Sequence, residues 1–332
     1  MDSVLQTMVN EKIGPGERAK TLVQNFCEEI KATTGAAYRT YPDCLIAALK
    51  AVGVKNGSCV AVSPLSPKIY EEVIKSIGAQ MILVDIDKET GCPNDCLVAQ
   101  SGADVLLLFE PYGTIPVKYN SETTFPESCD YSSVKVIEDI SQSIGSKIKD
   151  DFYAGQIGNV VVCAMEDDNV VSAGGGAVLA VRGDAVNALR GNRPSKYIAM
   201  PDMNAALGTV QLANLTENCN RRREILKTYQ QGLSKTRHKQ FGVNLIDFMS
   251  NAAYFVVQLE SRSDEIIKFA NKHDVPVMMA FEDCILKDFE GDPFEQAPVA
   301  ATYFFRAVQF PLYMFLKNSE IDGISKVVSH LP

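Results

Sequence analysis

Short runs of apolar residues recur along the first 181 residues of the chain. These runs, which we expect to be strands, are residues 58–62, 81–87, 103–110, 134–139, 159–165 and 176–181. Most are apolar at nearly every position rather than at every second one, and this is typical of strands buried on both faces. The pattern therefore predicts a mainly parallel sheet that is covered by helices.

The segments between these runs have apolar residues at helical spacing. The clearest are residues 17–31, 43–52 and 67–77. We expect Asp43 to cap the second of these helices at its start and Gly53 to lie near its end. Alternation of strands and helices of this kind predicts an α/β domain.

The pattern changes after residue 182. One long helix is predicted over residues 202–232. A strand over 254–260, a helix over 263–274, a short strand over 275–280 and a final helix over 318–330 follow. A chain of 332 residues suits one large and one smaller domain. We therefore predict a large domain over 1–200, and a long connecting helix with a small α+β domain over 201–332.

Charge and composition narrow the classes of function. The formal net charge of -9 argues against nucleic-acid and acidic-membrane partners. The tight basic cluster Arg221–Arg223 is interpreted as a solvated helix face rather than as a phosphate site. No run of 18 uncharged apolar residues occurs, and the first residues do not resemble a signal peptide, so we expect neither a membrane span nor export.

Cysteine and histidine are placed unfavourably for a metal site. The nine cysteines are scattered, and this arrangement suits reduced thiols in the cytoplasm. Cys92 and Cys96 are the closest pair, which is a weak metal or redox signal. The three histidines lie far apart in the sequence, so neither a zinc site nor a catalytic histidine is expected.

Acidic residues cluster where the predicted strands end. These residues are Asp85, Asp87, Glu110, Glu138 and Asp139. Ligands of open α/β sheets bind beyond the carboxyl ends of the strands. The candidate site is therefore expected at this edge of the sheet.

Nine stretches in order resemble one family. They are AALKAVGVKNGSCVAV (47–62), IGAQMILVDID (77–87), PYG (111–113), VIEDISQSIGS (136–146), GQIGN (155–159), GGGAVLA (174–180), AALGTVQL (205–212), RRREILKTYQQGL (221–233) and FPLY (310–313). Together they resemble the DegT/StrS type of sugar aminotransferase, a family of pyridoxal-phosphate (PLP) enzymes with the aspartate aminotransferase fold. The resemblance extends from about Gly14 to the C-terminus.

The resemblance implies a fold, partners and a cofactor site. The fold would be a three-layer, PLP-transferase-like large domain with a mainly parallel seven-stranded sheet, followed by a smaller domain. Family members are dimers with the site at the subunit interface, and they act on nucleotide sugars. Asp139 matches the acid that keeps the pyridine nitrogen protonated, and Gln142 matches the residue beside the ring hydroxyl.

The cofactor-binding lysine of the family has no counterpart in this chain. Its position falls on Glu166 or Asp167, within the segment MEDDNVVS (165–172). A Schiff base needs an amine, which a carboxylate cannot supply. The segment has no histidine either, although some relatives use histidine there to run a dehydratase. Its three consecutive acids would repel a phosphate.

The other cofactor contacts are also replaced. The phosphate grip falls on Thr40, Tyr41 and Pro42, the ring-stacking aromatic on Leu65 or Pro67, and the two residues that reach the partner subunit's site on Tyr197 and Ala199. Proline removes a backbone donor that a phosphate needs. Neither leucine nor proline has a π face for stacking. The sequence therefore suggests a degenerate member of the family.

Three functional hypotheses follow from these substitutions. In the first, the protein forms no PLP aldimine and is a non-catalytic or re-purposed homologue that binds a sugar nucleotide or a partner protein. In the second, it is an active aminotransferase on a keto-sugar nucleotide with PLP on a displaced lysine, for which Lys135, Lys147 and Lys149 are the nearest in sequence. In the third, Asp139 and Asp167 form a lysine-free acid–base pair.

Overall fold

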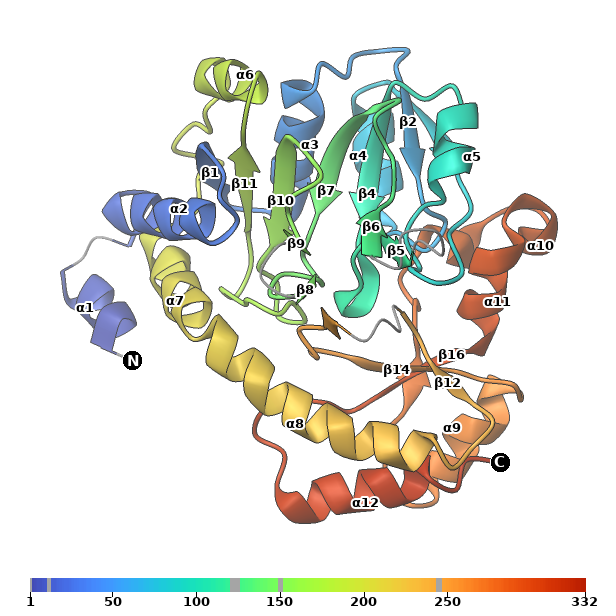
Figure 1. Cartoon of the computed structure of the whole chain (residues 1–332). Coiled ribbons are helices and arrows are strands. Elements are labelled where there is room, and N and C mark those ends of the chain that lie inside the picture. Colours follow the sequence, from blue (N-terminus) through green and yellow to red (C-terminus); the bar gives the residue numbers. More distant parts are fainter. Residues whose placement is uncertain (1, 11–12, 120–125, 149–151, 243–246) are drawn as a thin grey trace.

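The large sheet has seven strands and forms the centre of the molecule in the computed structural model, which describes residues 2–10, 13–119, 126–148, 152–242 and 247–332 (Figure 1). In sheet order the strands are β1 (Thr34–Tyr38), β11 (Ala177–Val181), β10 (Val160–Ala164), β7 (Lys135–Asp139), β4 (Val105–Phe109), β2 (Cys59–Val62) and β3 (Gln80–Leu83). β11 runs in the direction opposite to that of the other six strands. The predicted α/β fold with a mainly parallel sheet is therefore confirmed.

Helices cover both faces of this sheet. On one face α3 (Tyr41–Ala51), α4 (Ile69–Ser76) and α6 (Ala185–Gly191) pack on the strands. On the other face lie α2 (Glu17–Glu29), α5 (Asp95–Gln100) and α7 (Asp202–Ala213). The central strands β4, β10 and β11 are buried at every position, and this explains their continuous apolar runs.

A second, antiparallel sheet lies below the first in Figure 1. Its order is β12 (Lys239–Gln240), β14 (Phe255–Gln258), β16 (Ala307–Phe310) and β15 (Met278–Met279). The helices α8 (Leu215–Leu233), α9 (Ser263–Asn271) and α12 (Asn318–Val328) pack on it. The sequence pattern did not predict β12 or the inner strand β16. The domain boundary at residue 200 stays a prediction.

The remaining elements are short. They are α1 (Asp2–Val9), α10 (Pro293–Gln296), α11 (Pro298–Arg306), the 3-10 turns η1 (Pro111–Gly113) and η2 (Ile285–Asp288), the hairpin β5 (Val117–Tyr119) with β6 (Pro126–Ser128), and the small sheet β13 (Phe248–Met249), β8 (Lys147–Ile148) and β9 (Phe152–Tyr153). No helix in these described ranges is long and apolar enough to cross a membrane.

Two predicted helix features were wrong. The helix expected over 202–232 is two helices, because Asn214 interrupts it between α7 and α8. The Asn214 side chain donates to the carbonyl of Val210 at 2.9 Å, and such a bond competes with the helix backbone. The cap of α3 is Thr40 rather than Asp43, since the Thr40 hydroxyl accepts from the Asp43 N–H.

The interpretation of the basic cluster as a solvated helix face also needs correction. Arg223 donates from Nε to the carbonyl of Ser250 at 2.7 Å and from Nη2 to that of Gly145 at 3.1 Å. Nε and Nη1 of Arg222 are buried as well. Of the three residues, Arg221 behaves as expected, in an ion pair with Glu224 at the surface. Arg223 instead connects α8 to the loop after β7 through its hydrogen bond to Gly145.

Candidate functional site

Asp139 lies at the carboxyl end of β7 and is fully buried. Its Oδ1 accepts hydrogen bonds from the backbone N–H of Ser141 at 2.9 Å and from the Ser141 hydroxyl. Its Oδ2 accepts from the hydroxyl of Tyr70 at 2.6 Å and from that of Tyr41. Tyr41 is the first residue of α3 and Tyr70 lies in α4, so three separate elements converge on one carboxylate.

The pKa values in this cluster follow from burial and hydrogen bonding. Burial raises the pKa of Asp139 above its usual range, while the bonds from Ser141, Tyr41 and Tyr70 counteract that rise. Burial, together with the charge of Asp139, raises the pKa of both tyrosines well above the usual range. The two hydroxyls therefore keep their protons and act as donors.

These contacts leave no acceptor site on Asp139 for a pyridine nitrogen. An ionised carboxylate offers about four lone-pair positions. Here four donors from the chain itself already occupy the two oxygens. A protonated pyridine ring would have to displace Tyr41, Tyr70 or Ser141. The residues present at this position do not fit PLP.

Gln142 is also engaged by the chain itself. Its Oε1 accepts from the backbone N–H of Tyr112 at 2.9 Å, and its carbonyl accepts from Asn251 Nδ2 at 2.8 Å. Tyr112 has a left-handed backbone with φ of 51°, which its side chain tolerates poorly. The Gln142 side chain thus stabilises the turn after β4.

The loop that takes the place of the lysine segment carries Glu166, Asp167 and Asp168 at the surface. Glu166 folds back on the loop, since its Oε1 accepts from the Gly176 N–H at 3.2 Å and its N–H donates to Asn169 Oδ1 at 2.9 Å. The hydroxyl of Tyr254, from the second half of the chain, donates to the carbonyl of Asp168 at 2.7 Å.

Of the three candidate lysines, Lys135 lies at the opposite end of β7 from Asp139. Lys135 begins β7, whereas Asp139 ends it, so their Cα atoms are about 13 Å apart at ~3.3 Å per residue. Lys135 Nζ donates instead to the carbonyl of Val52 at 2.8 Å. Lys147 lies in β8, and Lys149 lies outside the described residues. The sequence has no lysine between Lys149 and Lys196.

The position of the phosphate grip is capped by the chain's own groups. The Thr40 hydroxyl donates to the Asp43 carboxylate at 2.6 Å, and Pro42 lies in the first turn of α3. An anion would therefore meet a helix start that already has a side-chain cap and lacks one donor.

The position of the ring-stacking residue is buried under the C-terminal half of the chain. Leu65 packs in a cluster with Phe281 and Cys284. The carbonyl of Ser66 accepts from the N–H of Ile285 at 3.0 Å, and Pro67 forms a bridge with Cys284. This segment therefore serves as a contact between the two halves of the chain.

The other acids at strand ends are likewise used internally. Asp85 accepts from the N–H groups of Val299 at 3.0 Å and Ala300 at 2.9 Å, and so holds the start of α11 against the large sheet. Asp87 accepts from the N–H groups of Glu89 and Thr90 within its own turn. Asp85 and Asp87 therefore have structural contacts.

Glu110 and Glu138 form a buried carboxyl pair. Glu138 accepts from three backbone N–H groups, of Gly155, Ile157 and Gly158, each at 2.7 Å. Burial and the neighbouring Glu138 raise the pKa of Glu110 well above its usual range. Oε1 of Glu110 has no donor facing it. A protonated Glu110 that shares its proton with Glu138 accounts for both observations.

The hypothetical pair of Asp139 and Asp167 does not form. Asp139 is fully buried and bonded to Tyr41, Tyr70 and Ser141, whereas Asp167 is exposed in the loop after β10. Sequence reasoning missed the roles of Tyr70 and Ser141. One signal was present in the sequence, since the bulky Tyr41 falls in the phosphate grip of the family, and its hydroxyl donates to Asp139 in the structure.

The large sheet has one antiparallel strand, and an acid lies at the end of β7. This arrangement is the fold of the PLP-dependent aminotransferases. The putative sugar aminotransferase Spr1654 of Streptococcus pneumoniae, in its PLP form, matches with a TM-score of 0.84 at 18% identity, over 99% of this chain and 95% of that one. DesV of S. venezuelae, in complex with a ketimine intermediate, matches with a TM-score of 0.84 at 17% identity, over 99% and 92%.

Sequence comparison identifies the family. The model of the DegT/DnrJ/EryC1/StrS aminotransferase family matches residues 1–329, and the chain belongs to this family. It is 23% identical to the dTDP-4-dehydro-2,3,6-trideoxy-D-glucose 4-aminotransferase of Saccharopolyspora spinosa, over 99% of this chain and 94% of that protein. It is 21% identical to the spore coat polysaccharide biosynthesis protein SpsC of Bacillus subtilis (strain 168), over 99% and 93%.

Proposed function

We propose that this chain is a non-catalytic member of the family that forms no aldimine with PLP. The observation that carries the proposal is the saturation of Asp139 by Tyr41, Tyr70 and Ser141. The absence of lysine between Lys149 and Lys196 in the sequence supports it independently. The occupied carboxylate of Asp139 and the missing amine each argue against cofactor binding.

The fold then serves binding rather than chemistry. We propose a homodimer, as the family resemblance implies, with a sugar nucleotide or a protein partner as ligand and a cytoplasmic location. The names of the relatives support a sugar nucleotide, since one of them is an aminotransferase of a dTDP-linked sugar. A thermal shift with a dTDP-sugar, compared with dTDP alone, tests this part.

The second candidate function is an active PLP-dependent aminotransferase on a keto-sugar nucleotide. The family membership and the sugar aminotransferases among its relatives favour it. It requires an amine within bonding reach of the cofactor's aldehyde carbon, together with displacement of the two tyrosines from Asp139.

One experiment separates the two candidates. The purified protein is mixed with an equimolar amount of PLP, its visible spectrum is recorded, and it is reduced with borohydride before peptide mass spectrometry. We expect no aldimine band and no reduced PLP on one specific lysine. A band that disappears on addition of glutamate, with PLP fixed to a single lysine, would establish the aminotransferase.

A further inference from the structure

The apolar residues of the first helix, α1, face away from the rest of the chain. The helix packs on α7, and Thr7 is buried there, with 3% of its surface exposed. In contrast, Leu5, Met8 and Val9 are 52%, 50% and 80% exposed. Residues at positions i, i+3 and i+4 share one face of a helix, so these three side chains form one row. We name this row the α1 stripe.

The orientation of α1 is the reverse of the usual one. A surface helix normally turns its apolar side toward the core and its polar side toward water. An isolated helix of two turns is marginal in water, so α1 depends on burial of an apolar face to stay helical. The helix has Asp2 and neither lysine nor arginine, which disfavours a surface of acidic lipids as its cover. The α1 stripe therefore favours an apolar protein surface as its partner.

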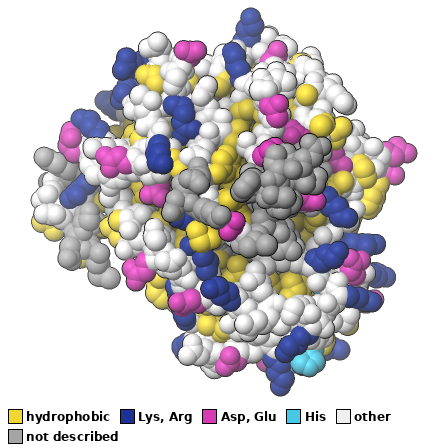
Figure 2. Space-filling model, in the orientation of Figure 1, with side chains coloured by type: hydrophobic (Ala, Val, Ile, Leu, Met, Phe, Trp, Pro, Cys, Tyr) yellow, Lys and Arg dark blue, Asp and Glu magenta, His cyan; other side chains and the backbone are white. Residues whose placement is uncertain are grey.

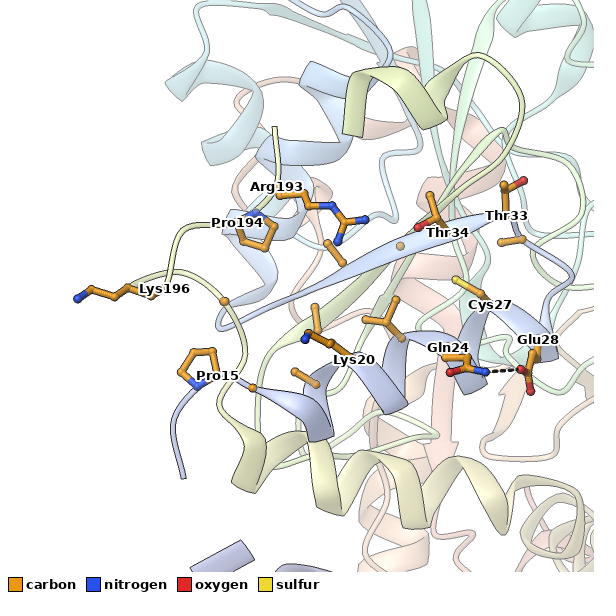
Figure 3. Close-up of a pocket in the computed structure, with 18 of the residues that line it drawn as sticks. Pro15, Lys20, Gln24, Cys27, Glu28, Thr33, Thr34, Arg193, Pro194 and Lys196 are labelled. Carbon is orange, nitrogen blue, oxygen red and sulfur yellow. Dashed lines mark hydrogen bonds between the residues drawn. The ribbon is translucent and has the colours of Figure 1, made fainter. Parts of the chain in front are cut away.

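An open groove along the free edge of β1 lies on the same side of the molecule as α1 (Figure 1 and Figure 3). Its volume is about 810 Å³, which is within the range of ligand sites. One wall is α2, through Ala19, Val23 and Cys27, and the other is the segment 193–199. The floor is β1 itself, so we name this feature the β1-edge groove.

The charges on the rim of the groove are largely engaged within the chain. Lys20 pairs with Glu17 at 2.7 Å. Lys31 and Lys196 each lie over a tyrosine ring, and Figure 3 shows Lys196 directed away from the groove. Figure 2 shows acidic side chains beside basic ones over the left half of the molecule. The groove therefore has little free charge to select a ligand, whereas its small apolar walls suit apolar side chains.

From these features we propose that the α1 stripe of one copy docks into the β1-edge groove of a second copy, and that the exchange is reciprocal. A helix that inserts residues i, i+3 and i+4 into an apolar groove is a common mode of recognition. Both surfaces belong to one chain and lie on one side of it, so a two-fold axis brings each opposite the other. This inference rests on the homodimer of the proposed function and names the surfaces that form it.

The position of Ala199 agrees with this arrangement. Ala199 lines the β1-edge groove, and the family resemblance assigns its position to the contact with the partner subunit. A second copy is therefore expected beside this wall of the groove. One occupant then covers two surfaces of the chain, the stripe and the groove.

Sedimentation of the full chain tests the proposal with one variant in each surface. Val9→Asp places a carboxylate in the stripe, and Val23→Lys places an ammonium in the groove wall on a side chain long enough to reach water in the monomer. We expect the parent to be a dimer and each variant to raise its Kd about tenfold or more, because a charge is then buried in an apolar contact. The control Leu97→Asp, in α5 on the opposite side of the molecule (Figure 1), should keep the Kd of the parent. Circular dichroism verifies that each variant is folded.

A mixture of the two variants gives the sharper result. A dimer of one Val9→Asp chain and one Val23→Lys chain keeps one native stripe in one native groove, and its other contact brings an aspartate toward a lysine. We therefore expect labelled Val9→Asp, which is monomeric alone, to sediment as a dimer when an equimolar amount of Val23→Lys is added. If the mixture does not associate, the exchange is refuted.

The remaining outcomes separate this inference from the homodimer itself. A dimer that persists unchanged in both variants would leave the homodimer standing and overturn the exchange. Dissociation by Val9→Asp but not by Val23→Lys would place the stripe against another surface, and this result also overturns the exchange. A parent that stays monomeric at every accessible concentration would overturn both the homodimer and the exchange, and would leave the proposed lack of a PLP aldimine unaffected.

Discussion

The hydroxyl of Tyr70 can be removed with little change in shape, by Tyr70→Phe. This takes one donor from Oδ2 of Asp139, which is fully buried. Hydrogen bonds to charged groups contribute about 1.5–3 kcal/mol each to the free energy of unfolding. We therefore expect a loss of about 1.5–3 kcal/mol near neutral pH, measured by urea denaturation followed by circular dichroism.

Tyr229→Phe is the matched control. Tyr229 is also fully buried, but its hydroxyl donates to a neutral backbone carbonyl, that of Pro311, at 3.2 Å. A neutral bond contributes about 0.5–1.5 kcal/mol, so the control should lose less stability, and its loss should not depend on the charge of Asp139.

The pH dependence of the Tyr70→Phe loss is the sharper part of the prediction. Burial raises the pKa of folded Asp139 above its unfolded value, so its contribution to stability is present at low pH and is lost as pH rises through the folded pKa. Tyr70→Phe removes one bond that lowers this pKa, and the pKa rises further. The variant should therefore lose most near neutral pH, and at about pH 4 only the smaller amount expected for a neutral bond, similar to that of Tyr229→Phe. Equal losses for Tyr70→Phe and Tyr229→Phe at both pH values would refute the reasoning.

Three further substitutions probe the same edge of the sheet. Asp167→Lys supplies an amine in the loop but should not yield a specific PLP adduct by mass spectrometry after borohydride, because Asp139 stays occupied; an adduct on the new lysine would contradict that occupancy. Asp85→Ala should lower the free energy of unfolding in urea by about 0.5–2 kcal/mol through loss of the α11 cap, whereas Asp85→Asn keeps one acceptor oxygen for one of the two N–H groups and should lose less. Glu110→Gln should reduce the free energy of unfolding least at high pH. The raised pKa of Glu110 makes the parent protein lose stability as pH rises, and the variant lacks that titration. If the free energy of unfolding of both proteins changes with pH in parallel, Glu110 is not the group responsible.

The large sheet could be predicted because burial on both faces marks its strands in the sequence. Val105–Phe109 and Val160–Ala164 are apolar throughout, and no helix of normal length would have such short runs. The inner strand β16 was missed because Ala307–Phe310 includes Gln309 and follows a helix without a turn signal. The break at Asn214 was missed because helical periodicity continues on both sides of it.

The sequence predicted the position of Asp139 in the fold but not the groups that surround it. Asp139 ends β7, as its position after an apolar run predicts. Tyr41 and Tyr70 are 29 residues apart and belong to different helices, so nothing local in the sequence brings their hydroxyls together. Their convergence depends on how α3 and α4 pack on the sheet, which is a tertiary property.

The four bonds to Asp139 also affect how the protein responds to its surroundings. An enzyme that binds its cofactor only when folded gains stability as the cofactor concentration rises. This chain satisfies its central carboxylate with Tyr41, Tyr70 and Ser141, so under the proposed function it gains no stability from the cofactor. Its Tm should be the same with and without PLP, and its abundance should be independent of vitamin B6 supply.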